Sequence, residues 1–507
     1  MKKFVAVLSV IAALGAFAAA SAADFAEPSA WRLSRHASVT NGILVVDVPA
    51  VSAAEGGSGR ARVDLAPFAG KLLEVEIRVR GENVTKGSVG WLGMKFMLHY
   101  ETEDGQQSWP QAKAEHGTFD WKTVRITHDM TATSVKGGTG ELVLGLQSAS
   151  GRLEFDLSSL KLREAAPIWP RVNGELKAKY SERVSSLPRL RGVMLPGGDV
   201  KRDDFETLSK WGATLARYQM IRGWGKENDN QDIVEYVNWL DGRLDHLERV
   251  VLPLAREFGI RIVVDLHVPP GGRDSDGEMN MFHDAAFAEC FVSCWRRIAK
   301  RFAGNSDIIY GYDLINEPQQ MRRALENCDY WNLQRRAAEA AREMDPVTTI
   351  IIESNGWDAP SAFAYLSPLA MDNVIYQAHM YIPHEFTHQG VGGRKWDRCA
   401  YPDEKKGWNR AWLRRQIEPV VAFGKRHGAR IYFGEFSAIA WADGADRYIA
   451  DVASIFEECG FDWTYHAFRE WQGWSVEHEC DRPDGKFRRS DDNARMRALK
   501  SALKAGR

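Results

Sequence analysis

The sequence predicts an N-terminal all-β sandwich followed by a larger α/β domain, a (β/α)8 barrel. Residues 24–165 contain short alternating strands separated by turns rich in Gly, Asp and Ser, with almost no helical periodicity. From residue 170 to residue 507, apolar strands alternate instead with amphipathic helices. Acidic side chains also stand at the ends of two of these later strands, where such a barrel carries its functional groups.

The first 22 residues have the pattern of a secretory signal peptide. Lys2 and Lys3 precede an apolar stretch over 4–17, and small residues continue to Ala22. A membrane anchor is the alternative, but the apolar stretch is too short to span a bilayer and no later segment is long enough. We therefore expect export to the periplasm or beyond, and no membrane span.

The expected sandwich occupies residues 24–165. Its turn-punctuated short strands are typical of two packed antiparallel sheets. Trp91, Trp109 and Trp121 could form one aromatic platform for a sugar, although at least one of them could instead belong to the core. A sandwich that only braces the second domain is the alternative. We expect strands at 60–65, 72–79, 95–100, 123–126, 141–146 and 153–157.

The expected barrel occupies residues 170–507, after a junction at 165–170. Eight strand and helix units predict a TIM barrel. A doubly wound open sheet is the rival, but its first strand is not followed by a glycine-rich phosphate loop. We expect helices at 285–301, 331–343 and 412–427. The expected strands are 190–195, 213–220, 261–268, 307–315, 348–354, 373–380, 430–436 and 462–468.

The charge balance and the cysteine content limit the kinds of partner and metal site that the sequence predicts. Lys and Arg number 66 against 68 Asp and Glu, which predicts no nucleic acid partner. Six cysteines could form disulfides in an oxidising compartment, and we expect a bridge between Cys399 and Cys480. Cys290 and Cys294 share one helix face, but without further ligands at suitable spacing they predict no metal site. We expect a monomer.

Polar residues gather at the C-terminal ends of six of the eight expected strands. Glu317 follows the strand 307–315, and Glu435 closes the strand 430–436. A single polar residue at a strand end has a structural explanation, but six equivalent positions predict a shared catalytic face. The candidate site residues are Arg217, His267, Asn316, Glu317, His379, Tyr381, Glu435, His466, Trp471 and Trp474.

Two carboxyl groups that face one substrate are typical of glycosidic bond cleavage. Glu435 would be the nucleophile, kept ionised by Arg217 and by the Tyr381 hydroxyl. Glu317 would carry the proton for the leaving oxygen. Asn316 could bind the 2-hydroxyl of the sugar, and His267 and His379 could bind other hydroxyls or orient the acid. A retaining mechanism requires the two carboxyl groups to be about 5–5.5 Å apart.

The segment Tyr312–Pro318, which ends in Asn-Glu-Pro, resembles the acid/base segment of glycoside hydrolase family 5, the cellulase-like retaining enzymes. Gly434-Glu435-Phe436 resembles the nucleophile segment of that family, and Arg217, His267, His379 and Tyr381 match its other motif positions in order. The resemblance extends from about residue 185 to the end of the chain. It implies two-step hydrolysis with net retention and with neither a metal nor an organic cofactor.

One position departs from the family pattern. His466 stands where the family carries a tryptophan under the sugar, so Trp471 or Trp474 would have to supply the stacking surface. The resemblance implies a secreted endo-β-1,4-glucanase that cuts a β-glycan. A β-mannanase and an exo-acting β-glucosidase are alternatives, and a catalytically silent glycan-binding barrel is the rival from another class. The N-terminal domain resembles carbohydrate-binding modules only in its expected fold.

Overall fold

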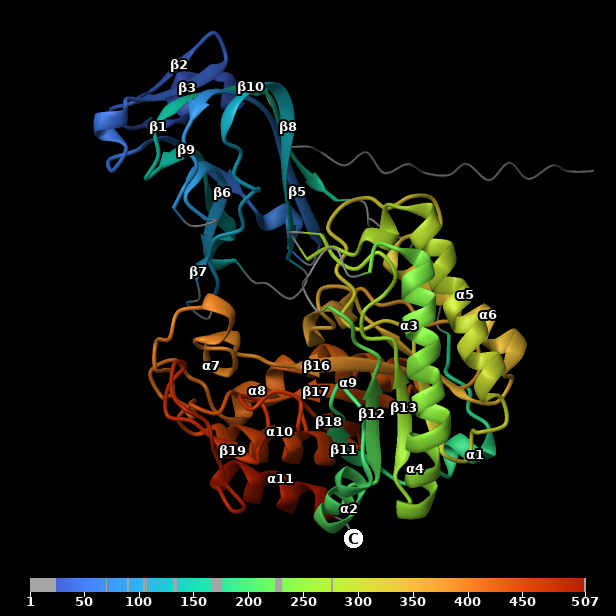
Figure 1. Cartoon of the computed structure of the whole chain (residues 1–507). Helices are drawn as coiled ribbons and strands as arrows, with labels where there is room; N and C mark the ends of the chain where they lie inside the picture. Colours follow the sequence, from blue (N-terminus) through green and yellow to red (C-terminus); the bar gives the residue numbers. More distant parts are fainter. Residues whose placement is uncertain are drawn as a thin grey trace, which may run out of the picture. The chain divides into compact units, whose positions relative to one another are not determined.

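The computed structural model describes residues 24–69, 71–88, 91–103, 105, 107–130, 135–165, 176–223, 230–274 and 277–505. The chain divides into two compact units, Met1–Pro167 and Ile168–Arg507 (Figure 1). The expected leader over 1–22 lies outside the described residues, as does most of the expected junction at 165–170.

The first unit is the predicted β-sandwich. Its two five-stranded antiparallel sheets have the orders β1-β4-β9-β6-β7 and β2-β3-β10-β5-β8. Alternate residues of β5, from Leu73 to Val79, enter an apolar core to which both sheets contribute. The strands are β1 (Arg32–Leu33), β2 (Ala37–Thr40), β3 (Ile43–Val48), β4 (Gly57–Asp64), β5 (Leu72–Val84), β6 (Gly93–Glu101), β7 (Gln107–Ser108), β8 (Gly117–Asp129), β9 (Thr139–Gln147) and β10 (Gly151–Glu164).

The hairpin of β2 and β3 was absent from the prediction, although the sequence carries a signal for it. Asn41 and Gly42 join the two strands, with φ angles of 50° and 73°. Asn-Gly is the preferred pair for a two-residue turn in which both central residues have positive φ.

The three tryptophans do not share one surface, so the prediction of a common platform is wrong. Trp109 stacks on His99 of β6, with ring centroids 3.5 Å apart. Trp121 belongs to β8, where the Arg80 guanidinium lies 5.0 Å from its ring centroid. The strands β6 and β8 belong to different sheets, and the outer faces of a sandwich point away from each other.

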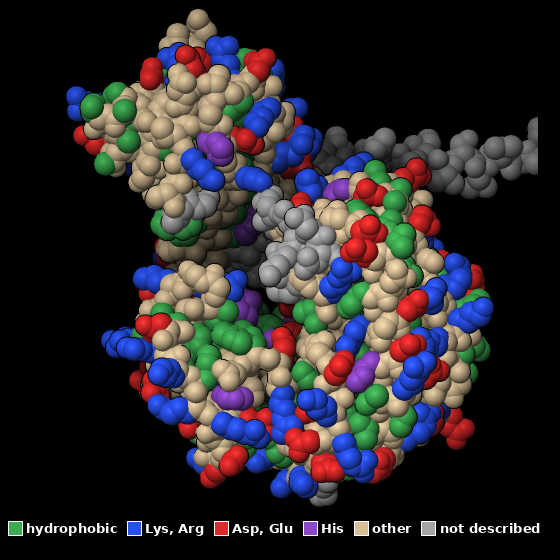
Figure 2. Space-filling view, viewed as in Figure 1, with side chains coloured by type: hydrophobic (Ala, Val, Ile, Leu, Met, Phe, Trp, Pro, Cys, Tyr) green, Lys and Arg blue, Asp and Glu red, His purple; other side chains and the backbone are tan. Residues whose placement is uncertain are grey.

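The second unit is a closed barrel of eight parallel strands, as predicted (Figure 1). Every strand pairs with the next, and β18 pairs with β11 to close the ring. Lys and Arg side chains are interspersed with Asp and Glu over the face that Figure 2 shows. The strands are β11 (Arg191–Met194), β12 (Leu215–Gln219), β13 (Arg261–Asp265), β14 (Ile309–Asp313), β15 (Thr349–Glu353), β16 (Val374–Met380), β17 (Ile431–Phe436) and β18 (Asp462–Tyr465).

Of the three helices predicted with bounds, those over 285–301 and 331–343 correspond to α5 and α6. The single helix expected over 412–427 is two helices, α8 and α9, because Pro419 has no amide hydrogen with which to continue α8. No helix among the described residues is long and apolar enough to cross a bilayer. The helices are α1 (Glu182–Ser185), α2 (Arg202–Trp211), α3 (Ile233–His246), α4 (Leu252–Phe258), α5 (Ala285–Phe302), α6 (Tyr330–Met344), α7 (His384–Thr387), α8 (Arg410–Gln416), α9 (Glu418–His427), α10 (Ala445–Cys459) and α11 (Ala494–Lys504).

All six cysteines are free thiols, so the predicted bridge between Cys399 and Cys480 is wrong. Each of these two thiols has a different partner. The Cys399 Sγ accepts a hydrogen bond from Lys406 Nζ at 3.5 Å, and the Cys480 Sγ donates one to the Arg482 carbonyl at 3.1 Å. Cys290 and Cys294 lie one turn apart on α5, with 4.0 Å between their sulfur atoms.

Candidate active site

A fully buried arginine organises the C-terminal end of the barrel. Arg217 lies on β12, and its guanidinium contacts four carboxylates and one amide from neighbouring strands. Such a fork of donors can bind several acceptors in fixed directions. Its Nε donates to Asp313 Oδ2 (2.8 Å), Nη1 to Glu435 Oε1 (2.6 Å), and Nη2 to Glu353 Oε1 (3.1 Å) and Asn316 Oδ1 (3.0 Å), while Asp265 Oδ1 lies 3.3 Å from Nη2.

The buried carboxyl groups at this end of the barrel differ in how readily they ionise. Burial raises the pKa of Glu353 and of Asp358 well above their ordinary range. Burial also raises the pKa of Asp313, to about 6, against the opposing effect of Arg217. Burial by itself would lower the pKa of Arg217, but the surrounding carboxylates outweigh it and keep the guanidinium charged. One cation is therefore shared among carboxyl groups of which Glu353 and Asp313 hold a proton more readily than a free carboxyl group does.

Glu435 is held in its ionised form. It lies on β17, with one oxygen bonded to Arg217 and the other accepting the Tyr381 hydroxyl at 2.7 Å. Burial would raise the pKa of this carboxyl, but positive charge on His379, His466 and Arg217 outweighs it and lowers the pKa. A carboxylate with both oxygens in charge-assisted or hydroxyl hydrogen bonds can act as a nucleophile at neutral pH.

Glu317 is held mainly through its backbone. It follows β14 with a φ of 50°, which is rare for a residue with a Cβ atom. Its amide donates to Glu353 Oε2 at 2.6 Å, and its carbonyl accepts from Arg273 Nη2 at 2.8 Å. Backbone geometry of this kind costs about 1–3 kcal/mol and persists only where surrounding contacts enforce it, often at functional sites.

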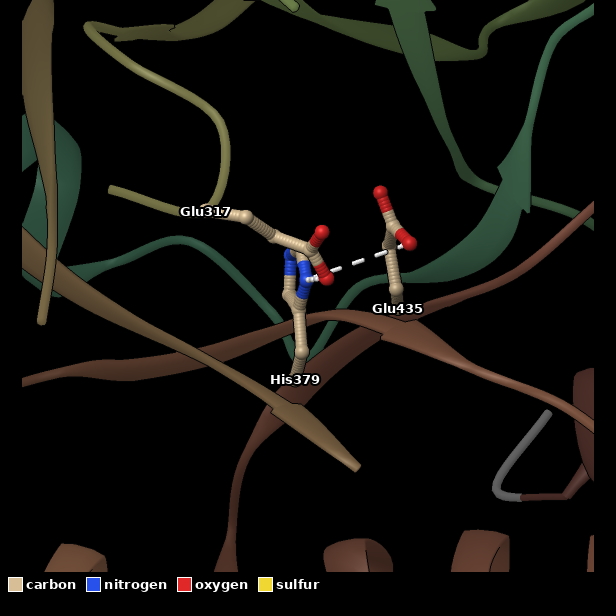
Figure 3. Close-up of side chains that lie close together, drawn as sticks. All are labelled: Glu317, His379 and Glu435. Carbon is tan, nitrogen blue, oxygen red and sulfur yellow. Dashed lines mark hydrogen bonds and ion pairs between the residues drawn. The ribbon is translucent and has the colours of Figure 1, made fainter. Parts of the chain in front are cut away.

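His379 lies between the two glutamates (Figure 3). Its Nδ1 is 2.9 Å from Glu317 Oε1 and 3.8 Å from Glu435 Oε2. One oxygen of Glu317 and one oxygen of Glu435 lie within 4.8 Å of each other. This is close to the spacing of about 5–5.5 Å between the carboxyl groups of retaining enzymes. Inverting enzymes separate the two groups by about 6.5–9.5 Å to admit a water molecule. The spacing observed here fits the retaining arrangement.

Two further predicted residues lie in the same layer. The Asn316 Oδ1 accepts from Arg217, while its buried Nδ2 has no hydrogen-bond partner among the described residues. His267 follows β13, and its Nδ1 lies 2.8 Å from Asp265 Oδ2. The structure thus brings Arg217, His267, Asn316, Glu317, His379, Tyr381 and Glu435 together at one end of the barrel.

The residues that follow β18 form the edge of this site. The His466 ring lies 6.1 Å from the Tyr381 ring and 5.6 Å from the Trp474 ring. Burial would lower the pKa of His466, but the negative charges of Glu470 and Glu435 raise it to about 9. Trp474 is buried, whereas 39% of Trp471 is exposed, so of these two only Trp471 offers a sizeable open ring face.

A model of the family described as Cellulase (glycosyl hydrolase family 5) matches residues 183–472, more than half of the chain. The chain belongs to glycosyl hydrolase family 5. As a member of this family it is a retaining glycoside hydrolase.

This family 5 chain also resembles individual members. It is 27% identical to endoglucanase C of Acetivibrio thermocellus over 305 residues, which cover 52% of this chain and 84% of that protein. It is 24% identical to cellodextrinase A of Ruminococcus flavefaciens over 282 residues, 54% of this chain and 79% of that protein. Among solved structures, Cel5A of Thermotoga maritima in complex with cellobiose shares 23% identity with a TM-score of 0.49, covering 64% of this chain and 99% of that one.

Several residues of the family 5 site were absent from the prediction. Arg273 binds the carbonyls of both Asn316 and Glu317 and lies 4.6 Å from the Trp357 ring centroid. Glu353 is the last residue of β15 and lies one residue before the end of the strand predicted over 348–354, a position comparable to that of Glu435. Asp265 and Asp313 are the last residues of β13 and β14, but the strands predicted over 261–268 and 307–315 extend beyond them, and Asp358 lies in a loop. Gln219 and Glu470 were also given no role.

Among the residues that the structure describes, two groups of side chains have the spacing of metal ligands. Glu317, His379 and Glu435 form one, and Glu353, Asp358 and His379 form the other. The first consists of the two facing carboxylates themselves. In the second, Glu353 already accepts hydrogen bonds from Arg217, from Gln377 Nε2 and from the Glu317 amide. These bonds occupy three of the about four lone-pair positions of the carboxyl group.

Proposed function

We propose that the protein is a secreted endo-β-1,4-glucanase that works by double displacement, with Glu435 as nucleophile and Glu317 as acid/base. The observation that carries the proposal is that one oxygen of Glu317 and one oxygen of Glu435 lie within 4.8 Å of each other. The similarity to endoglucanase C supports the choice of a β-glucan substrate.

In the first step, a Glu435 oxygen attacks the anomeric carbon and the bond to the leaving oxygen breaks. Glu317 gives its proton to that oxygen, and the sugar becomes an ester of Glu435. The Tyr381 hydroxyl and Arg217 hold the attacking carboxylate in place before the reaction. The Asn316 Nδ2 supplies a donor for the 2-hydroxyl, a contact that strengthens as the ring flattens.

In the second step, Glu317 acts as the base. It removes a proton from a water molecule, whose oxygen attacks the anomeric carbon and releases Glu435 as a carboxylate. His379 contacts the Glu317 carboxyl group and keeps it directed at the same face in both steps. Two inversions give net retention.

The test of this proposal combines substrate screening with a nucleophile variant. We expect the purified protein to cut soluble β-1,4-glucan faster than mannan or xylan, and to release the β-anomer first, as followed by proton NMR. Glu435→Gln should abolish turnover while glycan binding remains measurable by calorimetry. Full turnover by Glu435→Gln would contradict the assignment. Absence of turnover in the wild-type protein, with binding retained, would favour a silent glycan-binding barrel.

A second candidate is the cleavage of short soluble cello-oligosaccharides. The similarity to cellodextrinase A favours this activity. The sizes of early products from a long glucan separate the two candidates: an endo-acting enzyme releases a range of oligosaccharides and rapidly lowers the viscosity of the solution. An enzyme of short chains would instead leave the viscosity almost unchanged.

Export is part of the proposal and is supported by the leader pattern over residues 1–22. N-terminal sequencing of the protein isolated from its natural host should find a mature chain that begins close to residue 23. A mature chain that retains Met1 would contradict export by this route.

A further inference from the structure

A second polar cluster, formed by Gln219, His466 and Glu470, lies beside the two glutamates. Gln219 is two residues beyond Arg217 on β12, so both side chains leave the same face of the strand. Gln219 is therefore one layer nearer the open end of the barrel. Its side chain is fully buried, and its Nε2 donates to the Leu195 carbonyl at 2.7 Å and to Glu470 Oε2 at 3.1 Å.

The partners of Gln219 determine the orientation of its amide. Both are acceptors, so the atom that they contact must be the nitrogen. The amide oxygen then points elsewhere and, among the described residues, has no hydrogen-bond partner. Leaving a buried polar atom unpaired costs about 1–3 kcal/mol, and such an atom in a native site requires an explanation.

Glu470 is an ionised acceptor with one oxygen engaged. Its Oε2 receives Gln219 Nε2 and lies 3.1 Å from His466 Nε2. Its other oxygen, Oε1, takes part in neither of these bonds, and 26% of the side chain is exposed. Burial would raise the pKa of Glu470, but the positive charge of His466 and its hydrogen bond lower it. Two fixed donors thus orient a carboxylate whose second oxygen is available.

The cluster is directly connected to the nucleophile. The His466 amide donates to the carbonyl of Phe436, the neighbour of Glu435, at 3.1 Å. The His466 ring packs edge-on against Tyr381, whose hydroxyl is bonded to Glu435. In addition, the His466 Nδ1 is buried without a partner among the described residues. A sugar hydroxyl, which both donates and accepts, is the chemical group that suits such a mixture of acceptors and donors.

We propose that Glu470 is a specificity-determining residue, whose carboxylate accepts a hydrogen bond from a ring hydroxyl of the glucosyl unit attacked by Glu435. This inference rests on the proposed function. In an internal β-1,4-linked unit the oxygens at C1 and C4 are in linkages, and the 2-hydroxyl is assigned to Asn316. The 3-hydroxyl and the 6-hydroxyl remain, so Glu470 binds one of these two. Gln219 and His466 act as positioning residues for Glu470.

The test is a cycle that crosses one protein variant with modified substrates. The substrates are an aryl β-cellobioside and its 3-deoxy and 6-deoxy forms, modified in the ring that carries the aryl group. For the wild-type protein, we expect one of the two deoxy substrates to lose about 10- to 100-fold in kcat/KM. Glu470→Ala should lose a similar factor on the parent substrate and show no further loss on that same deoxy substrate.

Controls make the outcomes distinct. Glu479→Ala removes an exposed carboxylate on β19 (His478–Glu479) and should behave like the wild-type protein on all three substrates. Glu470→Gln keeps the shape of the side chain and should show the same loss of discrimination to a smaller extent, which guards against misfolding of the alanine variant. If the losses from Glu470→Ala and from both deoxygenations simply multiply, Glu470 does not bind a hydroxyl and the inference is wrong. If the wild-type protein hydrolyses none of the substrates nor any β-1,4-glucan, the proposed function fails and this inference fails with it.

Discussion

Glu317 follows β14 and Glu435 is the penultimate residue of β17, so both lie at the C-terminal end of the barrel, yet the protein holds them by different means. Glu435 is surrounded by donors and positive charge, namely Arg217, Tyr381 and two histidines. Glu317 is held by two backbone contacts that maintain a left-handed φ, and by His379 on its side chain. A carboxylate that must stay charged needs cations, whereas one that must gain and lose a proton needs a fixed position.

The largest effect should come from removing the nucleophile. Glu435→Ala should lower kcat/KM by about 10⁴-fold or more, since no other group can form the glycosyl ester. The loss should be equally large for glucan and for an aryl cellobioside with a good leaving group. Steady-state kinetics on both substrates measure it. A loss confined to one substrate would mean that Glu435 is not the nucleophile.

Removing the acid should have an effect that depends on the leaving group. Glu317→Ala should lower kcat on glucan by about 10²- to 10⁴-fold, since a sugar alkoxide needs a proton to leave. With a 2,4-dinitrophenyl leaving group, formation of the ester needs no such proton and should be much less affected. Pre-steady-state release of dinitrophenol measures this first step. Equal losses on both substrates would contradict the proposed difference in role between Glu317 and Glu435.

A smaller effect should follow loss of the hydroxyl that binds Glu435. Tyr381→Phe removes one donor to an ionised group, so we expect kcat/KM to fall about 10- to 100-fold while the fold is retained. Circular dichroism and kinetics together separate these effects. An unchanged kcat/KM would show that Arg217 alone is enough to hold the nucleophile.

The contact between Arg273 and the backbone of Glu317 offers a comparable test at the end of β14. Arg273→Met removes the donors to the Asn316 and Glu317 carbonyls together with the guanidinium over the Trp357 ring, and keeps an unbranched apolar side chain. We expect about a tenfold loss in kcat with little change in KM, because the acid loses orientation rather than substrate contacts. The matched control is Arg398→Met, since Arg398 also lies over a tryptophan ring, that of Trp396. An equal effect in the two variants would contradict the positioning role.

The smallest effect concerns stability at alkaline pH. The pKa of His466 is raised from its ordinary 6.5 to about 9, so its contribution is complete below pH 6.5 and is lost as the pH rises toward 9. Because Glu470 is partly exposed to solvent, we expect a decrease of only about 1 kcal/mol in the free energy of unfolding. Urea denaturation at pH 6.5 and pH 9.5 measures it. His466→Asn should lose this pH dependence, and an identical slope in both proteins would contradict the assignment.

Much of the barrel and part of its site followed from the sequence. The eight strands were predictable because each is a mainly apolar run between turn residues, and Glu317 and Glu435 because they stand at the C-terminal ends of two of these runs. Asp265 and Asp313, the charge partners of Arg217, were not predictable, because only the closed barrel brings their strands around Arg217. The break at Ile417 was readable from Pro419, whereas the separation of Trp109 from Trp121 depends on sheet order, which no local pattern encodes.

The positive φ of Glu317 has a consequence for how this chain can change over time. Glycine tolerates that backbone conformation at no steric cost, and asparagine tolerates it better than glutamate does. Selection for folded-state stability alone would therefore favour replacement of glutamate at residue 317. Only selection for catalytic activity opposes this replacement. In a descendant that no longer needs the activity, we expect Glu317 to be substituted earlier than Glu435, whose backbone conformation is not strained.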